Sequence, residues 1–243
     1  MPIEEKATKP IGYEKAAIYL SNLIKSESSF GFINYSGGTF NLRKFKDWDG
    51  QGIVFSGIMC WFCKDDRSNI FIAIEPRFNF EYDENSLHKV KPESEYLFIP
   101  PQLLDKSILA GSNLQEGELE RRLRGFRKPM VKPNKKAKNR DVVSWVNNFR
   151  SDSNFKELSS YGFTYFINNG KTKEGSERSF ISEFLIQNQI QFVRYFFGLD
   201  TDLKTDKLRL ILVPVDFSGK NIEPAGNRLD DESLLQYSWP PST

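Results

Sequence analysis

Two apolar segments near the end of the chain constrain its fold most. Residues 192–197 (FVRYFF) and 208–215 (LRLILVPV) are rich in β-branched and aromatic residues, and the stretch between them is polar. This pattern predicts a β-hairpin. Because both segments are almost continuously apolar, we expect protein to cover both faces of the hairpin, so that a core forms around it.

The chain is long enough for one large domain or two small ones. Of its 243 residues 39% are hydrophobic and 27% charged, as in soluble globular proteins. The net charge of +2 argues against a chain that binds polyanions over its whole surface. No apolar run reaches the roughly 20 residues of a membrane span. The N-terminal segment lacks the apolar centre of a secretory signal and two cysteines make no disulfide framework, so we expect a cytoplasmic protein.

Apolar residues at helical spacing predict several helices. The predicted helices span residues 13–25, 113–123, 141–150 and 179–189. Ser112 is the expected cap of the second helix, and Asn139 or Asp141 that of the third. Gly37-Gly38 is expected to be a turn, and residues 39–48 fit either a helix or a strand.

Runs of β-branched and aromatic residues predict a second hairpin and short strands elsewhere. Residues 53–63 and 70–74 form the second hairpin, and Pro76 is expected to end it. Short strand-like runs occur at 96–99 and within 155–167.

A basic segment divides this pattern into two halves. Residues 124–140 (RGFRKPMVKPNKKAKNR) form the least apolar part of the chain and contain two prolines, which is typical of a linker. Helix and hairpin patterns occur on both sides of it. We therefore expect a first α+β unit over residues 1–111, a helix and basic linker over 112–140, and a second α+β unit over 141–243.

The two halves carry their features in the same order. Each begins with a helix that holds an aromatic residue and an asparagine, and these pairs are Tyr19 with Asn22 and Trp145 with Asn148. Residues 39–48 and 179–188 then occupy matching places before a hairpin whose first strand is aromatic and whose second is aliphatic. Each half ends on an aromatic run before two prolines, YLFIPP and YSWPP. This order predicts a tandem duplication of units of about 100 residues. The alternative is coincidence within an ordinary α+β chain.

The second half also resembles a group of uncharacterised proteins from Bacteroidetes-type bacteria. The likeness covers about residues 141–241 and rests on WVNNFR, FVRYFFGLD, LRLILVPVDFSGKNI and the terminal SWPP. The positions that match the group's strand and turn motifs are Arg194, Tyr195, Phe197, Gly198, Asp216 and Gly219. This chain lacks the cysteines typical of the group's proline-rich end. The resemblance implies a small sheet-containing domain and no particular activity.

Cysteine and histidine offer little for catalysis or metal binding. Cys60 and Cys63 form a C-x-x-C motif inside the predicted strand 53–63, and residues three apart on a strand point to opposite faces. We expect them to be buried and inert rather than a redox or metal pair. The single histidine, His88, lies in a charged stretch, and two cysteines with one histidine cannot build a four-ligand zinc site. We predict no catalytic, cofactor-binding or metal-binding residue.

Carboxylates give no defined site either. Asp200, Asp202 and Asp206 have the spacing of a calcium loop, but the turn glycine is missing and Lys204 replaces a ligand, so a solvated hairpin tip is expected. Four other carboxylates lie near predicted elements but cannot be paired from sequence; they are Glu75, Glu81, Glu183 and Asp216. No glycine-rich phosphate-binding motif occurs.

The region around residues 121–140 is the strongest functional signal. It is rich in arginine and lysine, and these residues are Arg121, Arg122, Arg124, Arg127, Lys128, Lys132, Lys135, Lys136, Lys138 and Arg140. Such a density can neutralise several phosphates of a nucleic acid, although Phe126 alone is available for stacking on bases. The alternative interpretation is a solvated linker.

Together these features predict an α+β protein of two similar helix-plus-antiparallel-sheet units. Because local catalytic motifs are absent from the sequence, the leading functional hypothesis is a non-catalytic binding or scaffolding protein with a protein partner and no membrane. A nucleic-acid-associated protein that uses residues 121–140 is the second hypothesis. An enzyme that uses carboxylates is the third.

Overall fold

The chain folds as an α+β protein built from two antiparallel sheets and flanking helices. The computed structural model describes residues 9–26, 36–41, 55–78, 96–98, 102–103, 116–128, 135–155, 161–165, 192–201, 207–222 and 234–237. The helices of this part of the chain are α1 (Tyr13–Lys25), α6 (Glu116–Arg124) and α7 (Asn139–Ser151).

All strand pairs in the two sheets are antiparallel. The six-stranded sheet, here sheet A, has the order β1 (Lys9–Ile11), β11 (Leu234–Tyr237), β10 (Lys207–Val215), β9 (Phe192–Asp200), β2 (Ser36–Asn41) and β6 (Gln102–Leu103). The five-stranded sheet, here sheet B, has the order β7 (Lys135–Ala137), β5 (Tyr96–Phe98), β4 (Ile70–Phe78), β3 (Phe55–Lys64) and β8 (Tyr161–Tyr165).

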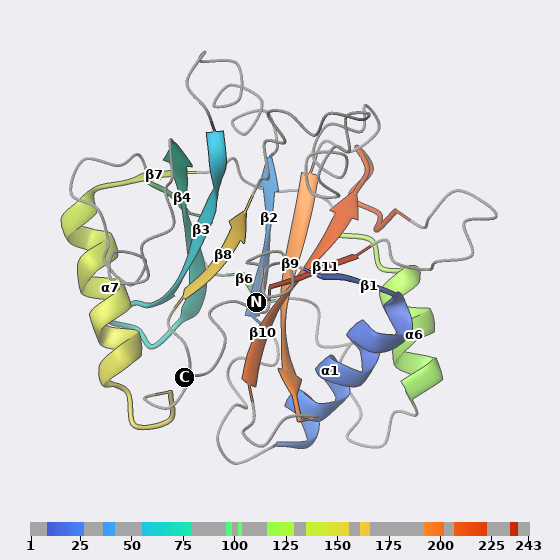
Figure 1. Cartoon of the computed structure of the whole chain (residues 1–243). Helices are drawn as coiled ribbons and strands as arrows, with labels where there is room; N and C mark the ends of the chain where they lie inside the picture. Colours follow the sequence, from blue (N-terminus) through green and yellow to red (C-terminus); the bar gives the residue numbers. More distant parts are fainter. Residues whose placement is uncertain are drawn as a thin grey trace, which may run out of the picture.

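The helices cover the outer faces of the sheets. From left to right, Figure 1 shows α7, sheet B, sheet A, and then α1 beside α6. The apolar stripe of α1, which includes Ala16 and Leu20, packs on Phe196 and Ile211 of sheet A. On sheet B, the stripe of α7 packs against the outer face of β3 and β4 in the same way. Removing these apolar stripes from water contributes most of the stability of helices this short, which are marginal on their own.

The inner faces of the two sheets meet in an aromatic layer. Phe62 of β3 and Phe197 of β9 lie edge to face, with ring centroids 5.7 Å apart. Tyr195 is buried in the same layer, and desolvation raises the pKa of its hydroxyl above the ordinary value. The central hairpins are therefore covered on both faces, as their continuous apolar runs predicted.

The two sheets exchange strands between the halves of the chain. The elements β1, α1, β2, β3, β4 and β5 form a first series, and β7, α7, β8, β9, β10 and β11 form a second with the same order. In sheet A the second series supplies the centre, β9, β10 and β11, while β1 and β2 of the first series flank it. In sheet B the first series supplies the centre, and β7 and β8 of the second series flank it. Each half thus completes the sheet of the other.

The registers of the two sheets correspond as well as their strand orders. Asn22 of α1 donates to the carbonyl of Leu199 at 3.2 Å, and Asn148 of α7 donates to the carbonyl of Lys64 at 3.3 Å. Both asparagines are the tenth residue of their helices. Counted from these carbonyls, Tyr195 corresponds to Cys60, and each of these two residues faces a glycine on the flanking strand. The glycine pairs are Gly38 with Tyr195 and Gly162 with Cys60.

Several local predictions are confirmed. The helix over 13–25, the hairpin of β3 and β4, the hairpin of β9 and β10, and the strands at 96–98 and 161–165 all form where the patterns indicated. The predicted helix over 113–123 is described from Glu116 onward. The predicted helix over 179–189, its match at 179–188, and Ser112 lie outside the described residues, as do His88, Asp202 and Asp206.

Other local predictions are wrong. Pro76 does not end β4, because beyond Ile74 no described strand pairs with β4 on the side away from β3, where a proline is tolerated. Gly37-Gly38 lies within β2 and is not a turn. The cap of α7 is Lys138, without a side-chain capping bond, rather than Asn139 or Asp141.

The predicted boundaries at residues 111 and 141 do not separate the sheets. The ranges 1–111 and 141–243 each contribute strands to both sheets. The segment 124–140 is not only a linker, because it contains the edge strand β7 and the start of α7. In the order of elements, β8 beside β3 holds the place that β2 holds beside β9, and the predicted match at residues 179–188 is not tested, since it lies outside the described residues.

Candidate interaction site

The basic residues of the segment 121–140 do not gather on one surface. On α6, Arg121 and Arg122 pair with Glu118, and Arg124 pairs with Glu120. These are pairs between residues three and four positions apart on an accessible helix, where carboxylates offset much of the positive charge. Hydrogen bonds from Arg121 and Arg122 hold the pKa of Glu118 below its ordinary value.

The remaining cations lie elsewhere. Lys135 and Lys136 are on β7, at the edge of sheet B, and Lys138 and Arg140 follow at the start of α7. Figure 1 shows β7 and α6 on opposite sides of the molecule. Lys132 lies outside the described residues. Arg127 and Lys128, in contrast, contact a turn that follows β10, and this turn forms the candidate site.

The turn is anchored from the sheet by Arg194 of β9, whose exposure is only 1%. Its Nη1 donates to Oδ1 of Asn221, and its Nη2 donates to the carbonyls of Lys128 at 3.1 Å and Gly219 at 3.0 Å. Its Nε donates to Oγ1 of Thr39 at 3.3 Å. One buried side chain therefore ties β2, the 126–128 segment and the turn to sheet A.

The burial of this guanidinium is costly and is offset by polar partners. Desolvation lowers the pKa of Arg194 to about 10, so the side chain remains charged at neutral pH. Its charge lies 4.6 Å from the ring centroid of Phe126, which adds a cation–π contact. Counted from the carbonyls of Leu199 and Lys64, the position of Arg194 in sheet A corresponds to that of Met59 in sheet B. The buried arginine therefore has no counterpart at the matching position of sheet B.

The turn itself is closed by a network around Asp216. Oδ1 of Asp216 accepts hydrogen bonds from the backbone and hydroxyl of Ser218 and from the backbone of Lys220. Burial alone would raise the pKa of Asp216, but these bonds and the charge of Arg127 outweigh it, so the net shift is downward. Gly219 has a φ of 80°, which is the left-handed conformation that glycine adopts without strain.

The segment 126–128 runs beside this turn. Nε of Arg127 donates to the carbonyl of Ser218 at 3.3 Å, and the backbone of Lys128 donates to the carbonyl of Gly219 at 3.0 Å. The backbone of Asn221 donates back to the carbonyl of Phe126 at 2.9 Å. The turn is therefore held on both sides of its tip.

Phe217 lies at the tip of this turn and is 70% exposed. It is the exposed large hydrophobic residue of the described part of the chain. Its ring makes an edge contact with Phe192, with centroids 6.4 Å apart. The side chains of Arg127 and Lys220 beside it are exposed. We call Arg127, Phe217, Ser218 and Lys220 the Phe217 surface.

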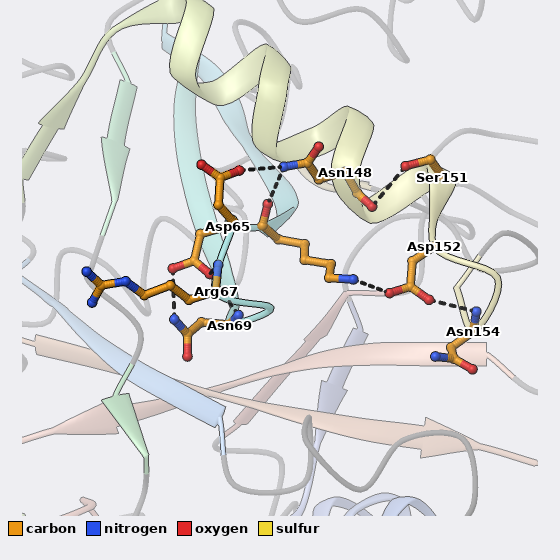
Figure 2. A network of polar contacts seen from close by, with 9 residues as sticks. Asp65, Arg67, Asn69, Asn148, Ser151, Asp152 and Asn154 are labelled. Carbon is orange, nitrogen blue, oxygen red and sulfur yellow. Dashed lines mark hydrogen bonds and ion pairs between the residues drawn. The ribbon is translucent and has the colours of Figure 1, made fainter.

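A second polar network joins α7 to the hairpin of sheet B. Figure 2 shows Asn148 and Asp152 at the end of α7 facing the loop that carries Asp65 and Asn69. Asn148 contacts Asp66, and Lys64 pairs with Asp152. The network has a counterpart in sheet A, where Asn22 bonds the carbonyl of Leu199 and also Thr201. Because an asparagine of the helix contacts the hairpin in both sheets, we interpret this network as one that holds each helix against its hairpin.

The other sequence candidates that the structure describes take part in packing or in structural polar contacts. Cys60 and Cys63 are buried free thiols, and burial raises the pKa of Cys63 above its ordinary value, which keeps it protonated and inert. Asp200 pairs with Arg209 at 2.6 Å within sheet A. Of the four carboxylates considered for catalysis, Glu75 bonds Trp61 in sheet B and Asp216 closes the turn, while Glu81 and Glu183 lie outside the described residues.

Among the described residues, no group of histidine, cysteine, aspartate and glutamate side chains has the arrangement of a metal site. None of the described helices is both long and apolar enough to cross a bilayer.

Sequence reasoning missed the Phe217 surface, although three residues that shape it carried a signal. Arg194, Asp216 and Gly219 belong to the motifs of the resemblance noted above, and the structure brings Arg194 and Gly219 into contact. Phe217 itself lies two residues after the end of an apolar strand, and its exposure had no signature in the sequence. Comparison with family models, with curated proteins and with solved structures found no match to this chain.

Proposed function

We propose that this chain is a non-catalytic binding protein that presents the Phe217 surface to a protein partner. The observation that carries the proposal is an aromatic ring that is 70% exposed at the tip of a turn held by hydrogen bonds on both sides. A large exposed ring is unfavourable in water, and a partner that covers it gains hydrophobic free energy. Because the turn is already ordered, little conformational entropy is lost on binding.

Aromatic and arginine side chains fit this role. Both residue types are enriched among the few residues that dominate protein interfaces. Phe217 on the turn and Arg127 on the segment beside it supply one of each. Nucleic-acid binding through residues 121–140 has less support, because the arginines of α6 already pair with glutamates.

The test is position-specific photo-crosslinking in the cells that make the protein. A photoreactive benzoylphenylalanine replaces Phe217 in one variant and Ser144, which is exposed on α7, in a matched control. We expect a crosslinked protein from position 217 that is not obtained from position 144. Purified partner is then expected to bind Phe217→Ala at least about 30-fold more weakly, which corresponds to about 2 kcal/mol. Identical products from both positions would argue against the proposal.

We also propose that the chain arose by tandem duplication and that it works in the cytoplasm. The matching element order, registers and asparagine contacts of the two series support the first proposal. Two buried free thiols support the second, since oxidising compartments favour disulfides. If the chain arose by duplication, a residue that is costly to bury and that occurs in one copy alone marks a position at which the two copies have diverged. Arg194, which anchors the Phe217 turn, is such a residue.

A further inference from the structure

We propose that this chain also forms a dimer in which two copies exchange halves. In that dimer the first half of one copy, up to Lys128, completes both sheets with the second half of the other copy, from Lys135 onward. The two remaining halves pair in the same way and close the assembly. This inference goes beyond the proposed function and does not depend on it. It follows from the way in which the two halves of one chain bind each other.

The halves of the chain bind each other at both sheets. In sheet A, β2 pairs with β9 and β1 pairs with β11, so that the blue strands of Figure 1 lie beside the orange and red ones. In sheet B, β8 pairs with β3 and β7 pairs with β5. The helices follow the same rule, because α1 packs on β9 and α7 packs on β3. Both cysteines of the chain are free thiols, so no disulfide joins the halves. The same contacts therefore form whether one copy or two copies supply the halves.

The turn that carries the Phe217 surface is also a contact between the halves. Arg194 of the second half donates to the carbonyl of Lys128, the last described residue of the first half. Nδ2 of Asn221 donates across the same boundary to the carbonyl of Leu123 at 2.8 Å. In the exchanged dimer each Phe217 surface therefore takes Arg127 from one copy and its other three residues from the second copy. The dimer presents two such surfaces, so a partner with two binding segments gains avidity.

A single short connection joins the halves. Six residues separate Lys128 from Lys135, and two of them are Pro129 and Pro133. Over this interval an extended chain reaches at most about 25 Å. The connection passes from the segment beside the turn of sheet A to β7 at the edge of sheet B. Short connections favour exchange, because they restrict the ways in which a chain can fold back on itself, while the contacts between the halves are kept.

The first experiment asks whether two damaged full-length chains repair each other. Ala73→Asp places a carboxylate in the centre of β4 of the first half, and Ile211→Asp does so at the corresponding place of β10 in the second half. Both positions are 0% exposed, and we expect neither variant to fold alone. After both are unfolded in urea, mixed and refolded, an exchanged dimer unites two intact halves. We expect a cooperative unfolding transition in the mixture that neither variant shows alone.

The second experiment refolds the wild-type chain at increasing concentration and measures the dimer by analytical ultracentrifugation. While the dimer is the minor species, mass action predicts that its fraction rises about tenfold for each tenfold rise in protein concentration. Insertion of about eight glycine and serine residues after Met130 should lower the dimer fraction about tenfold, because a longer connection favours pairing within one chain.

The control for the second experiment is Phe217→Ala, which is expected to change the dimer fraction less than twofold, because the exposed ring takes no part in the exchanged strand pairs. A dimer that disappears in this variant would be a face-to-face association through the ring and would overturn the inference. A wild-type chain that stays monomeric at every concentration would also overturn it. So would a mixture of the two aspartate variants without a new transition.

Discussion

Arg194 carries its charge into a position that is 1% exposed, and its hydrogen-bond acceptors are two carbonyls, an amide oxygen and a hydroxyl. A buried guanidinium is tolerated only when such partners replace its hydration. Its partners belong to segments far apart in the sequence, Lys128 and Gly219 among them. The free-energy cost of desolvating Arg194 is therefore offset by hydrogen bonds that order the turn that bears Phe217. The motif that contains Arg194 was visible in the sequence, but its partners were not, because they depend on tertiary contacts.

Arg194→Met replaces the arginine with the residue found at the corresponding place of sheet B. We expect it to lower the free energy of unfolding by about 2–4 kcal/mol, because the acceptors of Lys128, Gly219 and Asn221 lose their donor. Urea unfolding measures the loss. Hydrogen exchange should accelerate at the amides of Lys128 and Asn221 and remain slow in the centre of β9. Phe217→Ala is the control, with a change within about 0.5 kcal/mol. A Met variant with wild-type stability and a protected turn would show that Arg194 does not anchor it.

The helices and hairpins could be predicted from local sequence patterns, whereas the contacts between these elements could not. The 3.6-residue spacing of α1 predicted both of its ends, since its apolar stripe is decided within the helix. Pro76 and Gly37-Gly38 were misread because their tolerance depends on which strands lie beside them. The close approach of α1 to sheet A could not be predicted from the sequence either. A Cβ at Gly198 would lie 2.8 Å from the Cβ of Tyr19 and 2.9 Å from the Cδ1 of Ile211.

Two glycine-to-alanine substitutions test this packing with opposite expected signs. Gly198→Ala should destabilise the protein by about 1–3 kcal/mol, because the backbone of α1 must move away from β9. Gly117→Ala should stabilise it by about 0.5 kcal/mol, because nothing lies within 4 Å and alanine favours the helix. Thermal and urea unfolding of both variants provide the comparison. A stable Gly198→Ala variant would mean that α1 does not rest on the strand as described.

At the scale of the whole molecule, each half of the chain contributes strands to both sheets. The sequence contained enough local information to predict an α+β protein with two similar hairpin units. The local patterns did not predict that β2 pairs with β9 of the second half and β8 with β3 of the first half. Strand pairing between distant segments is a property of topology, which local periodicity does not encode.

Division of the chain between residues 131 and 132 tests this interdependence. Each fragment contains one full series of elements but lacks the two strands that flank its own three central strands, which are β7 and β8 for the first fragment and β1 and β2 for the second. We expect neither fragment to fold as a stable monomer, and we expect their mixture to give an equimolar complex with the circular dichroism and cooperative unfolding of the intact chain. Calorimetry and analytical ultracentrifugation of the fragments and the mixture measure this. A monomeric fragment with its own cooperative transition would contradict the exchange of strands.

Because the two halves of the chain exchange strands, sheet B cannot be completed until the second half has been synthesised. The hairpin of β3 and β4 leaves the ribosome well before β8, which pairs with β3. At translation rates of about 5–20 residues per second, the nascent hairpin waits roughly 5–20 s with an unprotected edge. Exposed edges of this kind invite pairing with other chains. Until β8 has been synthesised, the edge of β3 is therefore open to pairing with strands of other chains.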